Sequence, residues 1–396
     1  MIFLSYWFVV FAVAFFPAYY LAWRPRLRLV VLAAACVVFH GWFAGPAGVL
    51  PIVVLGVCTY LFGLSRQRHL CVLGMALSAA ALVFYKYTHF VAQSLLAAIP
   101  AAGSFVAATA EPLLPGSPPL AISFFVFEFV HYLFEVRRGG EPIRNPLHFG
   151  LFAIFWPSLV AGPIKRYRQY VPSLLEGVAC VGPADTVAGL LRVASGMLKK
   201  AAADNLTLWI ESQTPLYDSM SVPMRWAFLV FLAFRIYLDF SGYSDIAIGY
   251  ARMMGVRLLE NFNWPYAARS IDEFWTRWHI SLSSWIRDYI YIPLGGSRAG
   301  LGRKIVNGLL AFAICGLWHG AAWNFALWGL YHGAGLAVSS NYVGVLGRPG
   351  QRLSAGIARV PGLSWVLTLF FVCAGWLLFF FPAPVAWKMF VLLFQP

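Results

Sequence analysis

Charged residues are scarce in this chain of 396 residues, of which only 11% are Asp, Glu, Lys or Arg. Soluble domains carry about 25% charged residues, so an ordinary water-soluble fold is excluded. Hydrophobic residues make up 61% of the chain, and the mean hydropathy is +0.73. Since water cannot solvate so much apolar surface, we expect an all-α polytopic membrane protein divided into spans of about 20 residues.

Cysteine is also sparse, and the six cysteines form no Cys-x-x-Cys pair. Most of them lie inside apolar runs, so they predict small core residues and exclude a disulfide framework or a zinc site. We therefore expect no bound metal or cofactor. The first residues lack a charged region and a cleavage site, so residues 2–23 are interpreted as a retained span, not as a removed signal peptide.

Acidic residues are outnumbered by basic ones, which gives a net charge of +14 and a pI of about 9.7. No Lys/Arg-rich surface helix or RNA-binding motif is present, so nucleic acid is not an expected partner. In a membrane protein, Lys and Arg gather in cytoplasmic loops beside anionic lipid. The charge therefore fits a multi-pass membrane protein with membrane lipid around it.

Internal repeats and soluble domains are absent, so residues 1–396 are treated as a single membrane-embedded domain. Three stretches are expected within it: N-terminal spans, then re-entrant and cytoplasmic-side helices with spans, and finally the histidine-bearing helices with the last span (1–136, 137–304 and 305–396).

Three segments do not fit a plain span. The run 147–164 is flanked by basic residues at both ends and contains two prolines, which predicts a re-entrant element. Segment 252–304 is too polar for lipid and too aromatic for a loose loop, so we expect packed helices on the cytoplasmic side. The run 305–338 would be about 50 Å long as one helix, so it should break near 316–320 or 329–333.

His319 is the clearest candidate for chemistry, because an ionisable group inside an apolar run is costly and is therefore a functional candidate. A neutral imidazole there can accept a proton from a hydroxyl group. Trp318 and Trp323 are expected to wall a narrow channel beside it. The alternative is a structural histidine that is hydrogen-bonded between helices.

His279 is a second candidate for handling a proton or orienting a substrate. Arg277 and Arg287 could bind phosphate groups of a coenzyme A or phosphopantetheine donor. The other candidate donor-binding residues are Trp278, Ser281, Trp318, Trp323 and Asn324. The alternative for this segment is a helix held by pairs between its arginines and Asp272, Glu273 and Asp288. For His332 a structural role is expected.

Other polar groups at depth predict structural contacts. Asp239 and Asp245 could bind a cation, but pairing with Arg235 or Arg252 is the favoured interpretation. Three residues with the spacing i, i+3 and i+7 share one helical face and predict a polar seam between helices in preference to a metal site: Glu128, His131 and Glu135.

Three blocks of the sequence, 237–249, 274–296 and 316–333, resemble signatures of the membrane-bound O-acyltransferases. Stretches 122–125 and 160–164 support the resemblance, which is strongest to the bacterial branch of alginate O-acetyltransferases and of teichoic acid D-alanyl transfer proteins. It implies a multi-pass protein of the bacterial cytoplasmic (inner) membrane, with a ring of about 10–12 transmembrane and re-entrant helices around a thin central core with a tunnel.

The same resemblance implies that His319 is the catalytic histidine and His279 the second histidine of the family. The donor would be a cytosolic thioester, acyl-CoA or an acyl carrier protein. The acceptor would be a hydroxyl on an extracytoplasmic polysaccharide or on a periplasmic relay protein, with no metal involved. Segment 291–298 resembles the alginate-type branch, which favours acetyl over D-alanyl transfer. A transporter or channel, and a non-catalytic scaffold, remain as competing hypotheses.

Overall fold

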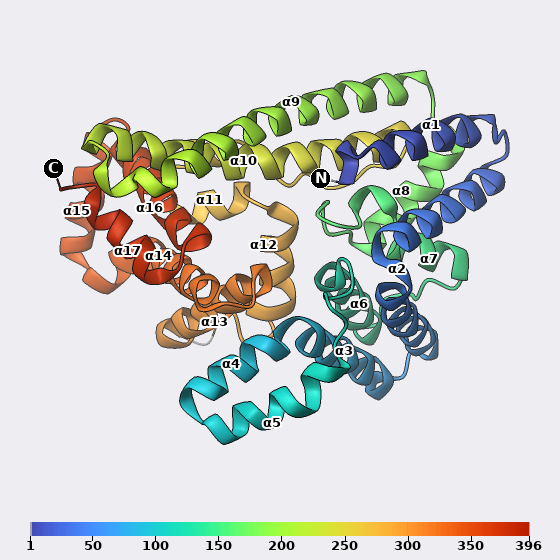
Figure 1. Ribbon diagram of the computed structural model, residues 1–396, viewed down its shortest axis with the longest axis horizontal. Coiled ribbons are helices and arrows are strands. Elements are labelled where there is room, and N and C mark those ends of the chain that lie inside the picture. The colour runs from blue at the N-terminus through green and yellow to red at the C-terminus, as the bar shows by residue number, and fades with distance from the viewer. Residues whose placement is uncertain (1, 299, 396) are drawn as a thin grey trace. The chain divides into compact units, whose positions relative to one another are not determined.

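A computed structural model of the protein describes residues 2–298 and 300–395, and every regular element in that part of the chain is a helix (Figure 1). Within these residues, five helices are long and apolar enough to cross a membrane, or six if the bent pair 167–180 and 183–219 counts as one span. The protein is therefore a multi-pass membrane protein. The predicted all-α polytopic architecture is confirmed, and the expected total of about 10–12 transmembrane and re-entrant helices stays a prediction.

The chain forms two compact units, the first made of residues 1–196 and 243–259 and the second of residues 197–242 and 260–396. The helices of the first unit are α1 (Tyr6–Leu21), α2 (Pro25–Ser65), α3 (Arg68–Leu82), α4 (Thr88–Ala98), α5 (Pro100–Ala110), α6 (Ile122–Arg137), α7 (Pro146–Ala153) and α8 (Tyr167–Cys180). Helices α9 (Pro183–Gln213) and α10 (Val222–Met253) each contribute residues to both units.

The second unit contains the short helices α11 (Ile271–Arg277) and α12 (Ile280–Ile286), and then α13 (Leu301–His319), α14 (Trp323–Leu346), α15 (Arg348–Arg359), α16 (Leu363–Phe380) and α17 (Ala383–Leu392). Segment 252–304 thus forms short packed helices, as its mixed polar and aromatic composition predicts. The ring of helices and the tunnel stay predictions, as does the single-domain organisation.

The run 147–164 forms no continuous span, as its flanking charges and prolines predict, and its re-entrant path stays a prediction. It breaks into α7, which has 8 residues, and a 3₁₀ turn at Trp156–Ser158. Eight residues rise only about 12 Å, far less than the ~30 Å core of a bilayer. Trp156 fixes this irregular segment, because its fully buried ring packs against Phe8, Phe11 and Phe39 of the same unit.

A polar seam joins α6 to the segment that follows the broken run. Its contacts are Glu128 with Lys165 at 2.7 Å, His131 Nε2 with the Tyr167 amide at 3.0 Å, and Glu135 with Arg168 at 3.1 Å. Lys165 also donates a hydrogen bond to Ser158 Oγ at 3.1 Å, so the buried ammonium has two partners. The predicted interhelical polar seam is confirmed.

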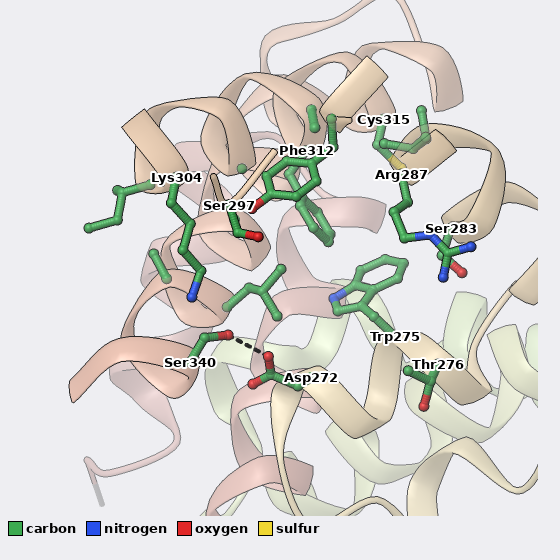
Figure 2. Close-up of a pocket in the computed structure, with 18 of the residues that line it drawn as sticks. Asp272, Trp275, Thr276, Ser283, Arg287, Ser297, Lys304, Phe312, Cys315 and Ser340 are labelled. Atoms are coloured by element: carbon green, nitrogen blue, oxygen red, sulfur yellow. Dashed lines mark hydrogen bonds between the residues drawn. The ribbon is translucent and has the colours of Figure 1, made fainter. Parts of the chain in front are cut away.

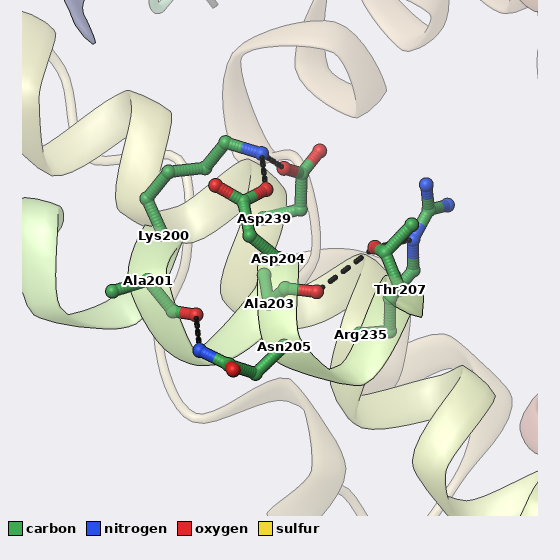
Figure 3. A network of polar contacts seen from close by, with 8 residues as sticks. All are labelled: Lys200, Ala201, Ala203, Asp204, Asn205, Thr207, Arg235 and Asp239. Carbon is green, nitrogen blue, oxygen red and sulfur yellow. Dashed lines mark hydrogen bonds and ion pairs between the residues drawn. The ribbon is translucent and has the colours of Figure 1, made fainter. Parts of the chain in front are cut away.

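The partners expected for Asp239 and Asp245, the two acids of α10, were wrong. Asp239 pairs with Lys200 at 2.5 Å and Asp245 with Arg192 at 2.9 Å, and both bases belong to α9. Figure 3 shows Lys200 between Asp239 and Asp204. Arg235 instead donates to Thr207 Oγ1 at 3.0 Å, and Arg252 pairs with Asp185 at 2.8 Å. Spacing along α10 could not reveal these partners, because they come from another helix.

Helices α13 and α14 form a closely packed hairpin whose tip is residues 320–322. The predicted break near 316–320 is confirmed, and the one near 329–333 is not found. Two glycines permit the close packing: a Cβ on Gly316 would lie 2.1 Å from the carbonyl oxygen of Phe325, and one on Gly329 would lie 2.1 Å from that of Phe312. Small residues at such positions let membrane helices approach closely.

Candidate active site

His319 is the last residue of α13, at the tip of this hairpin. Its ring centre lies 4.9 Å from that of Trp318, 5.2 Å from that of Trp328 and 5.2 Å from that of Phe379. The side chain is nevertheless only half-buried. Aromatic walls hold an imidazole in place, and partial exposure still allows a substrate to reach it.

Gly320 lets the chain leave the helix directly after His319. A Cβ at this position would lie 2.1 Å from the Phe325 ring, although the backbone is extended and would accept any residue. The ring of Phe325 in turn packs edge-on against Phe379, at 5.1 Å between centres. The position of His319 therefore depends on a glycine that leaves room for an aromatic ring.

His279 lies between α11 and α12, and its ring centre is 6.5 Å from that of His319. Its backbone has φ 42°, in the left-handed region that non-glycine residues rarely adopt. Asn261 supports this conformation, because its carbonyl oxygen accepts the Ile280 amide at 2.9 Å and its side-chain oxygen accepts the Ser281 amide at 3.3 Å. Such strained residues cluster at functional sites.

The imidazole of His279 is 1% exposed, and neither ring nitrogen has a hydrogen-bond partner among the described residues. Burial lowers the pKa of His279 well below its ordinary value, and the neighbouring His319 lowers it further. His279 is therefore neutral at pH 7. Buried polar atoms without a partner are costly and call for an explanation, such as a substrate group that they bind.

The separation of the two rings suits a shared substrate atom. At 6.5 Å between centres, the rings are too far apart for a direct nitrogen–nitrogen hydrogen bond of about 3 Å. Two hydrogen bonds of about 3 Å through one shared oxygen atom would match this separation. A hydroxyl or carbonyl oxygen placed there would contact a base on one side and a neutral imidazole on the other.

A cavity of about 620 Å³ lies in the same unit, between α11–α12 and the α13–α14 hairpin (Figure 2). Its walls are largely apolar, with Trp275 and Phe312 among them, while Lys304 and Arg287 lie on opposite sides. Cys315 also lines it and precedes His319 by four residues, which is one helical turn. The cavity thus reaches within one turn of the imidazole.

Comparison with known proteins decides the family. A profile of the membrane-bound O-acyltransferase family matches residues 126–380. The chain belongs to this family. It is 36% identical to a probable alginate O-acetylase of Azotobacter vinelandii over 98% of this chain and 76% of the relative. It is 30% identical to a peptidoglycan O-acetyltransferase of Helicobacter pylori over 79% of this chain and 62% of the relative.

A teichoic acid D-alanyltransferase of Bacillus subtilis is 29% identical over 67% of this chain and 71% of the relative. The predicted resemblance to the membrane-bound O-acyltransferases is thus confirmed, and the protein is an acyltransferase. The transporter and scaffold hypotheses are set aside by this membership.

The predicted donor-binding residues of the acyltransferase are distributed over several places. Arg287 alone among them lines the cavity. Trp278 is buried in an aromatic cluster, and Ser281 is fully buried. Trp318 lies against His319, whereas Trp323 is 64% exposed. The side-chain amide of Asn324 donates a hydrogen bond to the Leu378 carbonyl at 3.3 Å. Arg277 bonds to Glu273 at 2.6 Å.

The alternative of arginine–carboxylate pairs is confirmed in part. Glu273 pairs with Arg277, and Asp288 pairs with Arg287 at 2.9 Å. Asp272 instead accepts hydrogen bonds from two serines of α14, Ser339 at 2.7 Å and Ser340. This contact ties α11 to the hairpin at one wall of the cavity (Figure 2).

Sequence reasoning missed several residues that line the cavity of this acyltransferase. They include Trp275, Ser283, Lys304 and Asn341. Lys304 had a recognisable signal, because it is the last charged residue before a long uncharged run, and its ammonium donates to Asn341 Oδ1 at 2.7 Å. His332 is fully buried between the rings of Trp275 and Trp328, and, as at His279, neither ring nitrogen has a hydrogen-bond partner among the described residues. Its structural role stays a prediction.

Proposed function

We propose that this acyltransferase moves an acetyl group from a cytosolic thioester, acetyl-CoA or an acetylated carrier protein, to a hydroxyl on an extracytoplasmic polysaccharide or relay protein. The observation that supports this most directly is the pairing of His319 with the buried, neutral His279 at 6.5 Å. A bacterial inner membrane would then separate donor from acceptor.

His319 acts as the general base in this proposal. Its imidazole takes the proton of the acceptor hydroxyl while the oxygen attacks the thioester carbonyl. The tetrahedral intermediate collapses, the carbon–sulfur bond breaks, and the thiolate leaves and receives the proton from the His319 imidazolium. The products are an ester and a free thiol, and no other reactant is needed.

His279 has the complementary task of positioning. A neutral imidazole has one N–H donor and one acceptor nitrogen. Because no described residue occupies either atom, the N–H is available to the substrate oxygen on which negative charge develops. Preorganised donors aimed at such an oxygen typically contribute a factor of about 10²–10³ to kcat.

The cavity beside the hairpin suits the arm of the donor. Its volume of 620 Å³ lies in the range of about 300–1,000 Å³ that is typical of small-molecule sites. Apolar walls accommodate a flexible arm, and the cations of Arg287 and Lys304 complement phosphate groups. Cys315, one helical turn before His319, is among the residues that line the cavity.

Acetyl is the acyl group that the comparisons support best. The relatives named O-acetylase and O-acetyltransferase match more of this chain, and at higher identity, than the D-alanyltransferase does. D-alanyl transfer to a cell-surface polymer is the second candidate, because the match to the D-alanyltransferase extends over two thirds of the chain.

The test uses the full chain in proteoliposomes, with radiolabelled acetyl-CoA and a hydroxyl-bearing polysaccharide, and measures the ester label on the polymer. We expect His319→Gln to lower the rate about 10²–10⁴-fold, the usual contribution of a general base. His89→Gln is the matched control, since that histidine is exposed and paired with Glu111.

Equal rates for the His319→Gln protein and the wild type, with both folded, would refute the proposed role. A parallel reaction with a D-alanyl-loaded carrier protein decides between the two acyl groups. Label transferred from that donor alone would replace acetyl with D-alanyl.

A further inference from the structure

Helix α15 is a short connecting helix that is held at one face of the membrane-embedded unit. It follows α14 and ends at Arg359, four residues before α16 begins at Leu363. Helices α13 and α16 are both candidate membrane spans. The hydrogen bond from Lys304 to Asn341 places the end of α14 beside the start of α13. One end of α15 therefore lies near the start of α13, and its other end is connected to the start of α16. Because both of these are ends of candidate membrane spans, α15 lies at a membrane surface.

Around its axis, α15 has a basic side, a side that packs against the protein and an apolar side between these two. Arg348, Arg352 and Arg359 are four and seven residues apart, so at 100° per residue they lie within about 40° of one another. Gly350 is buried, and a Cβ there would lie 2.8 Å from a carbonyl oxygen of α14, so that side packs against the protein. Leu353 lies between these two sectors, about 120° from the arginine stripe, and is 52% exposed.

The arginines have no carboxylate partner among the described residues. All three are exposed, and the sequence contains no Asp or Glu after Asp288. Exposed Val360, at the end of the helix, extends the apolar flank of Leu353. The helix therefore presents an unneutralised positive stripe next to an exposed apolar flank, at the level where a bilayer has anionic headgroups and the beginnings of its acyl chains.

We propose that α15 is an interfacial helix that binds anionic phospholipid headgroups through Arg348, Arg352 and Arg359, with Leu353 and Val360 inserted beside them into the acyl region. Helices with a basic face and an adjoining apolar face lie in this way in the plane of the interface. An acidic soluble protein would be attracted by the same charge, but it would leave the apolar flank in water. The proposal does not depend on the acyl group or on the acceptor.

The test measures hydrogen exchange of residues 348–359 by mass spectrometry, with the full chain in nanodiscs of phosphatidylcholine alone or with 30% phosphatidylglycerol. Each juxtamembrane arginine is worth about 1 kcal/mol, or about fivefold, at an anionic surface. We expect at least tenfold slower exchange in the anionic nanodiscs, with the difference lost at about 1 M salt, where screening is strong.

The variant R348Q/R352Q/R359Q should lose this difference. The matched control R24Q/R26Q/R68Q removes the same charge from exposed arginines elsewhere and should keep it. Equal exchange in both lipids, or a difference that the triple α15 variant retains, would overturn the proposal. So would protection that arises only when an acidic soluble protein is added. Monodisperse elution of each variant in detergent shows that the protein is folded.

Discussion

Gly320→Ala tests whether the hairpin tip determines the position of His319. The added methyl group would lie 2.1 Å from the Phe325 ring, and the backbone itself is not strained by alanine because its φ is −160°. The Phe325 ring must therefore move toward Phe379, against which it packs. The ring centre of Phe379 is in turn 5.2 Å from that of His319. Overpacking of this kind costs about 1–3 kcal/mol.

We expect the rate of acyl transfer to fall about 10- to 100-fold, because a displacement of a catalytic group by roughly 1 Å can lower the rate about 10²-fold. The assay is kcat for ester formation in proteoliposomes, together with the same measurement on Phe325→Leu and on the double variant. Since leucine removes the ring that obstructs the methyl group, the double variant should regain at least tenfold over Gly320→Ala alone.

Gly344→Ala is the matched control, because a Cβ at that position of α14 meets nothing within 4 Å. It should leave kcat unchanged and raise helix stability slightly, by about 0.5–1 kcal/mol. If Gly320→Ala is fully active, or if the double variant is no better than the single one, the packing of the tip does not set the geometry of His319.

Three further outcomes follow from the structure. Glu128→Gln should lower the free energy of unfolding by about 3–5 kcal/mol, seen as a lower midpoint in denaturant, because it leaves the buried Lys165 ammonium without its counter-charge. Arg287→Gln and Lys304→Gln should each raise KM for acetyl-CoA severalfold at nearly constant kcat; a loss confined to kcat would contradict a donor-binding role. The lowered pKa of His279 means that the unfolded chain takes up a proton below about pH 6.5 and the folded chain does not. The free energy of unfolding should therefore fall by up to about 1.4 kcal/mol for each pH unit below that value. In the His279→Asn protein, the slope of this free energy against pH should be smaller by that amount.

Much of the local structure was predictable because it depends on residues that are close in sequence. The polar seam of Glu128 and its neighbours follows from helical spacing, and the break after His319 follows from glycines in a run too long for one span. The partners of Asp239 and Asp245 were mispredicted, because spacing on α10 favours candidates on the same helix. The true partners come from α9, and only packing brings them within reach.

The sequence by itself determined that lipid is the main solvent, that the blocks around His279 and His319 resemble those of an acyltransferase, and that the run 305–338 breaks near 316–320 or near 329–333. Composition and the lengths of apolar runs carry the first and the third of these, and the resemblance to the membrane-bound O-acyltransferases carries the second. Only the tertiary structure placed the rings of His279 and His319 6.5 Å apart and arranged Lys304 and Arg287 around one cavity. The physical reason is that distances between helices depend on how side chains interlock, as Gly316 and Gly329 do here, and no periodic pattern along one chain encodes them.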